Sequence, residues 1–369
     1  MNVPAGQQTA GLRFVTPGDI YNATPPRIVF GAGAIDSIAE EVARLGAKRV
    51  MIVSTPGRQT MAEMVAKRLG AVVADTLPEA ISQVPIEMAR RGQQRARDVG
   101  VDCLVSVGGG ASVGLGKAIA LELGLPIIAI PTTYSGSEVT GFCGITIDGV
   151  KRMHTSLKML ATTIIYDPEL TLSLPADVSA ASALNALAHC VDVIYVPTAD
   201  PMIVLAAIEG ARVVAQSIRE VLRQPNDVAV RSRMLYGAYL SGAALTGGFA
   251  LQHGLAHTLG GSFNVPHGLS HAIILPHVAA YNARYAAAPM TKLANALGTT
   301  DVGGAIFDLL VDLGLPTALS QVGISPLDVP QIAQITVETD NGLNPGPVTI
   351  EAVTGITEAA LRGERPATP

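Results

Sequence analysis

The chain has 369 residues, of which 49% are hydrophobic and 15% charged, and its net charge is −5. This composition excludes a disordered chain, and the negative balance argues against binding to a nucleic-acid backbone, which proteins contact through Lys and Arg. The length is sufficient for two ordinary domains with sizeable cores.

Three features of the sequence bear on where the protein works. Cys103, Cys143 and Cys190 are far apart and form no CxxC, which is typical of a reducing compartment. The N-terminal residues MNVPAGQQTAG lack the basic and apolar regions of a secretory signal. No run of about 18 apolar residues is free of charges and turn breakers, so no membrane-spanning helix is expected. We therefore predict a cytoplasmic protein that binds neither membrane nor nucleic acid.

The first part of the chain alternates short β-rich runs with helical patterns. Strands are predicted at 28–30, 49–54, 71–74, 103–107 and 126–130. Helices are predicted near 35–45, at 60–69, at 87–99 and from residue 112 onward. This order predicts a mostly parallel sheet that is covered by helices.

After Asp167-Pro168 the pattern changes to long helices rich in Ala and Leu. They are predicted at about 177–195, 201–223, 227–246, 249–260, 267–284 and 302–313. Strand signals nearly vanish in this part. We therefore predict an α/β domain with a Rossmann-like parallel sheet over residues 1–167 and an all-α domain over residues 168–369.

Two loops in the first domain have the composition of a nucleotide site. The run 108–112 (GGGAS) follows a predicted strand, and its glycines let the backbone approach a pyrophosphate at the start of the next helix. The run 131–138 (PTTYSGSE) follows the next strand and supplies small hydroxyl groups. The GxGxxG fingerprint is absent, and each loop alone would also fit an ordinary turn. Together they predict binding of NADH or NADPH, with contacts from Ser54, Thr55, Gly108, Gly109, Gly110, Ala111, Ser112, Thr132, Thr133 and Ser137.

The choice between the two coenzymes is left open by the end of the strand at 49–54. An enzyme selective for NAD often places Asp or Glu there, against the ribose 2′-hydroxyl, and none is present. Arg58 follows instead and could pair with a 2′-phosphate, which favours tolerance of NADPH.

The second domain concentrates histidine. Six of the seven histidines lie between residues 189 and 277, and polar pairs spaced i, i+4 recur at 185/189, 253/257 and 267/271. A lone histidine on an apolar helix is usually structural, but burying several imidazoles is costly without a purpose. We therefore predict a functional cluster around His189, His253 and His267.

Two chemistries fit such a cluster. Imidazoles could hold a divalent metal that polarises a carbonyl, or they could supply protons and stabilise an enolate without a metal. Asn185 stands where an anionic ligand would help, and an amide brings no charge, so we predict that no metal is bound. Asp192 is an alternative carboxylate on an uncertain helix face.

Five segments resemble the iron-containing alcohol dehydrogenase superfamily. They are VGGGAS at 107–112, PTTYSGSEVT at 131–140, IIYDPELT at 164–171, NALAH at 185–189 and HGLAHTLGGSFNVPHG at 253–268. The resemblance implies a dehydroquinate synthase-like fold, with an α/β domain, a helical domain and usually a homodimer. In metal-binding members an Asp and three His hold the ion. Their places here are Asn185, His189, His253 and His267, so the Asp is missing.

That substitution, with GLGKAIAL at 114–121 and LPHVAAYNA at 275–283, is most similar to the maleylacetate reductase branch. The resemblance implies a metal-independent enzyme of aromatic-ring degradation that uses NADH or NADPH to convert maleylacetate into 3-oxoadipate. The branch usually has TPIWG, an Arg-bearing GRDxRVLP and NPRP. This chain has TGFCG at 140–144, HTSLKML at 154–160 and NPGP at 344–347. With those arginines missing, Lys158 is the nearest replacement, and Tyr134, Phe142 and Lys158 are predicted to contact the substrate.

The predicted chemistry is hydride transfer followed by protonation from histidine. His253 is the predicted principal acid, supported by His257, with His189, His267 and Asn185 around the substrate carbonyl. Because the chain differs from the branch in the three segments named above, a related enone is an alternative substrate. These differences also leave three other functions open: a metal-dependent alcohol dehydrogenase for an aldehyde or ketone, a lyase, cyclase or dehydratase on the same scaffold, and a nucleotide-binding protein without turnover.

Overall fold

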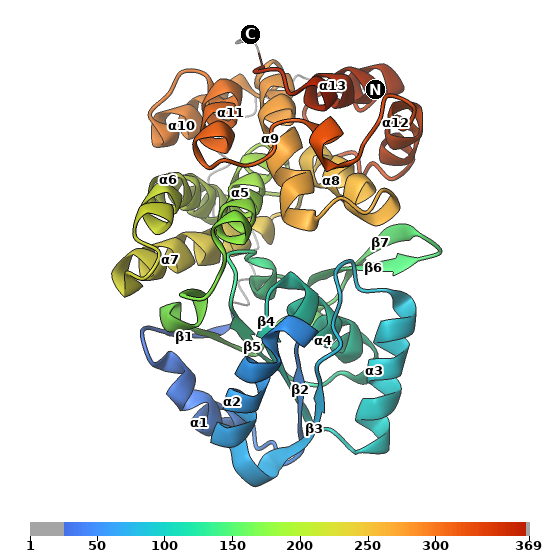
Figure 1. The fold of residues 1–369 in the computed structure, drawn as a ribbon. Coiled ribbons are helices and arrows are strands. Elements are labelled where there is room, and N and C mark those ends of the chain that lie inside the picture. Colours follow the sequence, from blue (N-terminus) through green and yellow to red (C-terminus); the bar gives the residue numbers. More distant parts are fainter. Residues whose placement is uncertain (1–25, 367–369) are drawn as a thin grey trace, which may run out of the picture.

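The structure is a computed structural model that describes residues 26–366. An α/β half carries a helical half, and both are seen from the side in Figure 1. The N-terminal residues from which we predicted that a secretory signal is lacking lie outside the described residues, so this prediction is not tested.

The α/β half contains a six-stranded sheet in which every neighbouring pair of strands is parallel, as the sequence predicted. In spatial order the strands are β1 (Arg27–Phe30), β8 (Thr163–Tyr166), β5 (Ile127–Pro131), β4 (Cys103–Gly108), β2 (Val50–Val53) and β3 (Val73–Leu77). The order reverses between β2 and β4. Ligands of open parallel sheets bind in the crevice at such a point, beyond the carboxyl ends of the strands.

Alternating side chains of the strands bury both faces of the sheet. In β2, Val50 and Ile52 belong to the core beneath α1 (Ile38–Arg44) and α2 (Gln59–Leu69). Met51 and Val53 belong to the core on the other face. Two helices cover that second face, α3 (Ile86–Asp98) and α4 (Gly110–Leu123).

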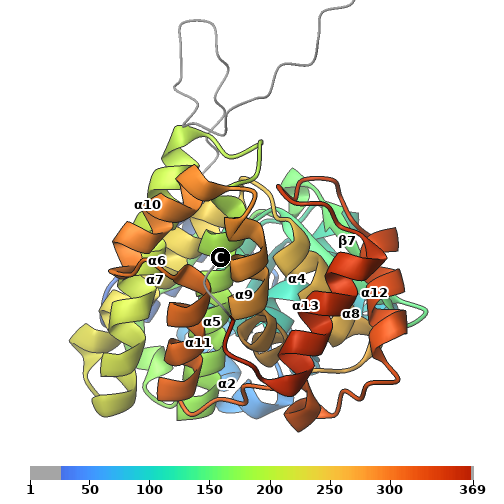
Figure 2. The same cartoon turned by 90° about the horizontal axis from the view of Figure 1, so that it is seen from above.

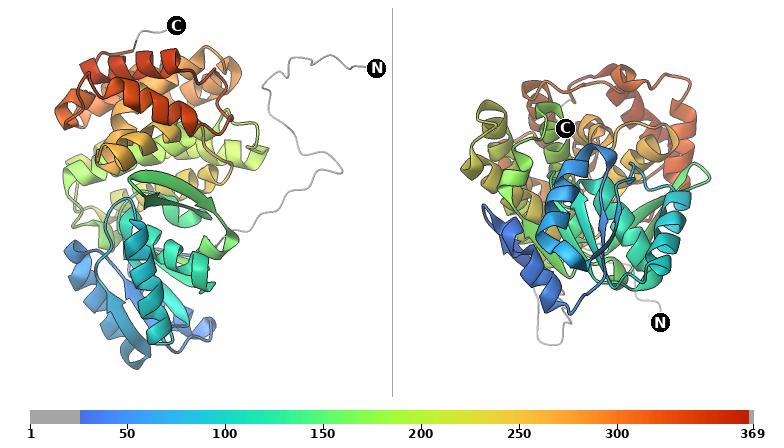
Figure 3. Two further views of the ribbon diagram at one scale, coloured as in Figure 1. Left: turned by 90° about the vertical axis from the view of Figure 1, so that its right-hand side faces the viewer. Right: turned by 60° about the horizontal axis from the view of Figure 1, so that its bottom comes forward.

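An antiparallel hairpin that was not predicted projects from the α/β half. Its strands are β6 (Phe142–Ile147) and β7 (Val150–Thr155). Asp148 and Gly149 connect them with φ values of 51° and 75°. Two positive φ angles are typical of a type I′ turn, for which Asp-Gly is a preferred sequence. The hairpin lies between the two halves (Figure 3), where β7 packs against the helix that carries His253 and His257.

The second half is helical, as predicted, and Figure 2 shows it from above. Its helices are α5 (Ala176–Val193), α6 (Pro201–Arg223), α7 (Val228–Leu245), α8 (Leu251–Ser262), α9 (His267–Ala283), α10 (Ala287–Leu297), α11 (Val302–Asp312), α12 (Val329–Glu338) and α13 (Ile350–Arg362). The sequence analysis did not predict α10, α12 or α13. Helix α5 is almost wholly buried against α6, α7 and α9.

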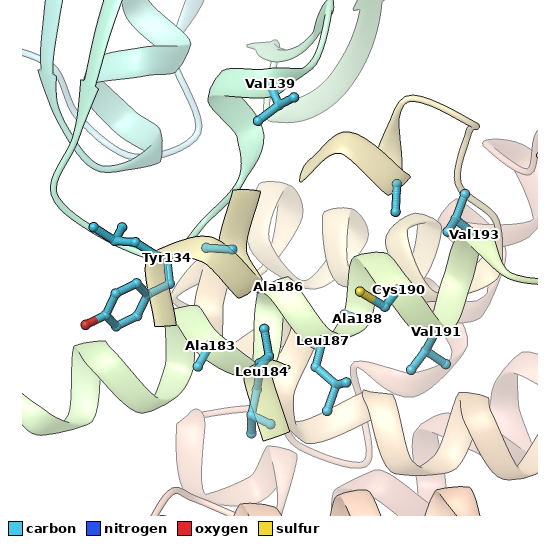
Figure 4. Close-up of a cluster of buried hydrophobic side chains, with 14 of the residues drawn as sticks. Tyr134, Val139, Ala183, Leu184, Ala186, Leu187, Ala188, Cys190, Val191 and Val193 are labelled. Carbon is cyan, nitrogen blue, oxygen red and sulfur yellow. The ribbon is translucent and has the colours of Figure 1, made fainter. Parts of the chain in front are cut away.

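The two halves share one hydrophobic core. Figure 4 shows Leu184, Leu187 and Val191 on α5, with Tyr134 and Val139 from the α/β half in the same cluster. The continuous core holds the crevice of the sheet against the histidine-bearing helices.

Helix α6 is the one helix in the described part of the chain that is long and apolar enough to cross a membrane. It packs against α5, α7 and α10 and pairs Glu209 with Arg212 on its surface. Core helices of water-soluble proteins meet the same criteria of length and composition, and charges within a membrane span are costly.

Candidate active site

A cavity of about 630 Å³ lies between the two halves and is lined by residues of both. Residues of the predicted nucleotide loops line one wall. All five predicted catalytic residues line the opposite wall, namely Asn185, His189, His253, His257 and His267. The structure therefore brings the two predicted sites together in one space.

The glycine loop is shaped by close contacts that larger residues would break. Gly108 has a φ of +139°, and a Cβ atom there would lie 2.5 Å from the hydroxyl of Ser112. A Cβ atom on Gly109 would lie 2.8 Å from Cγ2 of Thr133. The glycines thus allow the loop after β4 to lie directly against the loop after β5.

Several buried hydroxyl groups beside this loop have no hydrogen-bond partner within residues 26–366. They belong to Ser54, Ser112, Thr132 and Thr133. Buried polar groups are normally hydrogen bonded, so unpaired hydroxyls at the crevice of a sheet fit a polar ligand. Gly110, Ala111, Thr133 and Ser137 line the cavity itself. These residues fit the dinucleotide that the sequence predicted.

Arg58 follows the end of β2, where an enzyme selective for NAD often places Asp or Glu against the ribose. A Cβ atom on Gly108 would be 4.0 Å from Cγ of Arg58, so the arginine borders the glycine loop. Its Nη1 donates a hydrogen bond of 3.2 Å to Oγ of Ser173, and no carboxylate pairs with it in the described part of the chain. The guanidinium therefore remains available to an anion at the end of β2.

Lys117 on α4 fixes the second loop. Its Nζ donates to the carbonyl oxygen of Ser137, to Oγ1 of Thr140 at 3.0 Å and to the carbonyl oxygen of Phe142 at 2.9 Å. Burial lowers the pKa of Lys117 to about 8. All three donor positions of the ammonium group are used within the protein, so Lys117 positions the wall of the cavity.

Five histidine rings form a contiguous cluster on the helical wall. His189 and His253 stack with centroids 5.2 Å apart, and His257 and His267 stack at 6.1 Å. His271 lies at the centre, 4.8 Å from His253 and 4.7 Å from His267. His277 is elsewhere, lining a second cavity with α13. Helices α5, α8 and α9 each contribute to the cluster, which explains the repeated spacing of four residues.

Burial keeps most of the cluster uncharged. Burial is the largest cause that lowers the pKa values of His189, His257, His267 and His271 well below 6.5, and neighbouring histidines lower them further. Neutral imidazoles can each donate one hydrogen bond and accept another. The cluster therefore offers polar contacts to a ligand carbonyl without placing several positive charges together.

His253 differs because it is backed by a buried carboxylate. Its Nδ1 lies 2.8 Å from Oδ2 of Asp192, and both side chains are almost fully buried. Asp192 also accepts hydrogen bonds from the backbone N–H of Ala250 at 2.6 Å and from the hydroxyl of Tyr195 at 2.8 Å. With Nδ1 donating to the carboxylate, Nε2 of His253 is the nitrogen left for a ligand, and it has no partner in the described structure.

The histidines do not fit a metal site in this arrangement. Within residues 26–366 no three His, Cys, Asp or Glu side chains are grouped so that they could hold an ion. His189 and His253 meet face to face with an interplanar angle of 25°, and Asn185 stands in place of an anionic ligand. Asp192 is engaged by His253 and backbone amides.

The structure places one of the three predicted substrate contacts at the cavity and the other two away from it. Phe142 lines the cavity and packs edge-on against Phe249. Tyr134 is fully buried in the shared core, where its hydroxyl accepts a hydrogen bond of 2.7 Å from Arg231. Lys158 is exposed on a short 3-10 helix and does not line the cavity. The hairpin turns Lys158 away, which sequence distance alone could not show.

Two residues that line the cavity were not predicted, Lys117 and Lys151. Asp192 was predicted only as an alternative carboxylate, and in the structure it supports His253. For Asp192 a signal existed, because it follows His189 by three residues and therefore lies on a neighbouring part of the same helix face. For Lys151 no signal distinguished it from an ordinary basic residue at the surface.

A parallel-sheet crevice joined to a helical wall of polar side chains defines a two-domain, dinucleotide-dependent oxidoreductase. The chain belongs to the iron-containing alcohol dehydrogenase family. The model described as "Iron-containing alcohol dehydrogenase" matches residues 25–168, and the one described as "Fe-containing alcohol dehydrogenase family, C-terminal" matches residues 179–361.

Within this family the chain belongs to the maleylacetate reductase branch, as its motifs predicted. It is 42% identical to the maleylacetate reductase of Burkholderia cepacia over 94% of this chain and 99% of that protein. The crystal structure of maleylacetate reductase from Agrobacterium tumefaciens is 40% identical, with a TM-score of 0.87 over 94% of this chain and 99% of that one. A structure from Ralstonia eutropha JMP134 described as an alcohol dehydrogenase is 45% identical, with a TM-score of 0.91 over 97% and 100%.

Proposed function

We propose that this protein reduces maleylacetate to 3-oxoadipate at the expense of NADH or NADPH, without a metal ion. One observation carries the proposal: the nucleotide loops and a histidine backed by a buried carboxylate line the same cavity. The similarity to maleylacetate reductases over nearly the whole chain supports the choice of substrate.

The reaction requires a hydride, a proton and a site for transient negative charge. Reduced nicotinamide, when bound, supplies the hydride to the alkene carbon β to the ketone. The electron pair of the double bond moves onto the ketone oxygen as an enolate. The enolate then takes a proton at the α carbon, so that one substrate, one NAD(P)H and one proton give 3-oxoadipate and NAD(P)⁺.

His253 is suited to deliver that proton. Asp192 holds its ring through Nδ1, which leaves Nε2 free to pass a proton to the substrate. The neutral rings of His189 and His267, with the amide of Asn185, can donate hydrogen bonds to the developing oxyanion. Phe142 and Phe249, which pack edge-on against each other, form an apolar part of the cavity lining.

We further infer that the enzyme accepts NADPH as well as NADH. Arg58 borders the glycine loop, and its planar guanidinium is suited to a 2′-phosphate. We also infer a cytoplasmic enzyme of aromatic-ring degradation that acts as a homodimer. The buried, free state of all three cysteines is compatible with a reducing compartment.

A direct assay tests the proposed function. The purified protein is mixed with maleylacetate and either coenzyme, oxidation of the coenzyme is followed by absorbance, and the product is identified by mass spectrometry. We expect 3-oxoadipate in equal amount to the coenzyme consumed, with little turnover of simple aldehydes. Oxidation of the coenzyme by aldehydes but not by maleylacetate would support the alcohol dehydrogenase alternative and contradict the proposal.

A further inference from the structure

A partly buried cation with no partner in the described part of the chain lies on the hairpin wall of the cavity. Lys151, on β7, lines the cavity, and no carboxylate or other acceptor bonds its Nζ within residues 26–366. The partly buried Arg95, by contrast, is paired with Asp75. Burial lowers the pKa of Lys151 to about 8, so its ammonium group is mostly charged at neutral pH. An unpaired charge that is partly removed from water is unfavourable unless a ligand of opposite charge pairs with it.

Two glycines make room for this lysine. A Cβ atom on Gly144 would overlap the methylene groups of the Lys151 side chain. A Cβ atom on Gly261, at the end of α8, would lie 2.9 Å from Cβ of Lys151. The side chain is therefore held in a defined path between the hairpin and α8, and its charge is directed along the cavity wall.

The start of α9 lies close to the same charge. His267 is the first residue of this 17-residue helix, and the charge of Lys151 is the second largest cause that lowers the pKa of His267. The N-cap, Pro266, provides no side-chain cap. The amides of Gly268 and Leu269 belong to the first turn, so they have no acceptor inside the helix, and both residues line the cavity.

The remaining charges of the cavity favour an anion at this position. Lys117 is fully engaged by oxygen atoms of its own loop. Asp177 is the only carboxylate side chain among the cavity-lining residues of the described structure, and it is exposed at the start of α5. Lys151 is thus the one cation on this wall whose donors are all available to a ligand.

We propose that Lys151 and the first turn of α9 form a binding subsite for a substrate carboxylate. The inference rests on the proposed function, and it specifies how a dicarboxylic enone is recognised where Lys158 had been expected to act. An ammonium group and exposed helix amides are both ligands that a carboxylate prefers. A carboxylate held there lies in the same cavity as Nε2 of His253, so this contact would orient the chain of the substrate across the histidine cluster.

The test compares Lys151→Met with two other variants of the hairpin region. Lys151→Arg keeps the charge, and Arg152→Met removes an exposed neighbouring charge that does not line the cavity. We expect Lys151→Met to raise KM for maleylacetate roughly 10- to 150-fold, the range for a hydrogen bond to a charged group. Lys151→Arg should recover most of the loss, Arg152→Met should leave KM unchanged, and the affinity for NADH should be the same in all variants.

A second measurement separates this proposal from the proposed function. Binding of adipate, an unreactive dicarboxylate, to the protein with NADH is measured by calorimetry, and a thermal melt checks that each variant folds. Weaker binding in Lys151→Met would support the subsite even if maleylacetate is not the substrate. Equal affinity of wild type and Lys151→Met for adipate, or an effect of Lys158→Met in place of Lys151→Met, would overturn it.

Discussion

The two walls of the cavity recognise ligands by different means. The α/β wall uses backbone and small hydroxyl groups, since Gly108 and Gly109 allow loops to touch and Ser112 and Thr133 offer unpaired hydroxyls. The helical wall uses large titratable side chains, of which His253 alone has a buried carboxylate partner within residues 26–366. The comparison indicates that coenzyme binding and proton transfer are carried out by different walls of the cavity. Substitutions on one wall should therefore leave the function of the other wall intact.

The largest effect is expected at the proton donor. His253→Ala should lower kcat at least about a hundredfold, because positioned acid catalysis typically contributes about 10²–10⁴-fold, and NADH affinity should stay near normal. Steady-state kinetics and NADH fluorescence titration measure the two quantities. His277→Ala provides the control, since this buried histidine lies outside the cluster. Turnover near wild type in His253→Ala would remove His253 from the mechanism.

A smaller but more specific effect is expected from its carboxylate partner. Asp192→Asn keeps the shape of the side chain but removes the negative charge beside Nδ1 of His253, which would stabilise the imidazolium formed during proton transfer, so kcat should fall roughly 10- to 100-fold. Tyr195→Phe removes one hydrogen bond to Asp192 and retains the charge, so it should cause a much smaller change. A purely structural role would lower the melting temperature and leave kcat of the folded variant unchanged.

The opposite wall is tested by Gly109→Ala. The added Cβ atom would lie 2.8 Å from Thr133, so the two loops must move apart. We expect the Kd for NADH to rise about tenfold, equivalent to about 1.4 kcal/mol, with kcat at saturating coenzyme almost unchanged. Fluorescence titration gives the Kd. An equal loss in kcat would show that the two walls are not independent.

The pH dependence of KM sharpens the role of Lys151. Its pKa of about 8 means that the charge is present below pH 8 and lost above it, so KM for a dicarboxylate should rise about fourfold from pH 7 to pH 8.5. The groups around it are Cys143, whose raised pKa keeps it a thiol, and His257 and His267, whose lowered pKa values keep them neutral.

Lys117 also has a pKa of about 8, so a control is needed. In Lys151→Arg the charge on the hairpin persists at every pH of this range. We expect a nearly flat KM profile in that variant, and a profile as steep as that of wild type would assign the titration to Lys117.

The smallest effect is expected from removal of metal ions. Because the histidine wall does not fit a metal, prolonged incubation with a chelator should change kcat by less than about twofold. Elemental analysis of the purified protein provides the second readout. Stoichiometric iron or zinc, with activity lost on chelation and restored by the ion, would contradict the metal-independent mechanism.

Local patterns were sufficient to predict much of the fold. Four of the five predicted strands lie within one or two residues of β1, β2, β4 and β5, and most of the predicted helices begin close to their observed positions. Strand β3 begins at Val73 because the preceding residues continue helix α2 as a short 3-10 turn. The hairpin was missed although Asp148-Gly149 marked its turn, since its strands lack a clear apolar alternation.

The sequence by itself determined strands β1, β2, β4 and β5, helices α1 to α9 and α11, the nucleotide loops and the histidines that lie one helical turn apart. These features depend on neighbours within a few residues, where spacing and residue type carry the physical information. Only the tertiary structure decided that Asp192 supports His253, that Tyr134 belongs to the core, and that Lys151 rather than Lys158 enters the cavity. Those outcomes depend on how separate helices and a hairpin pack together, and contacts between residues 61 or 97 positions apart leave no periodic trace in a single sequence.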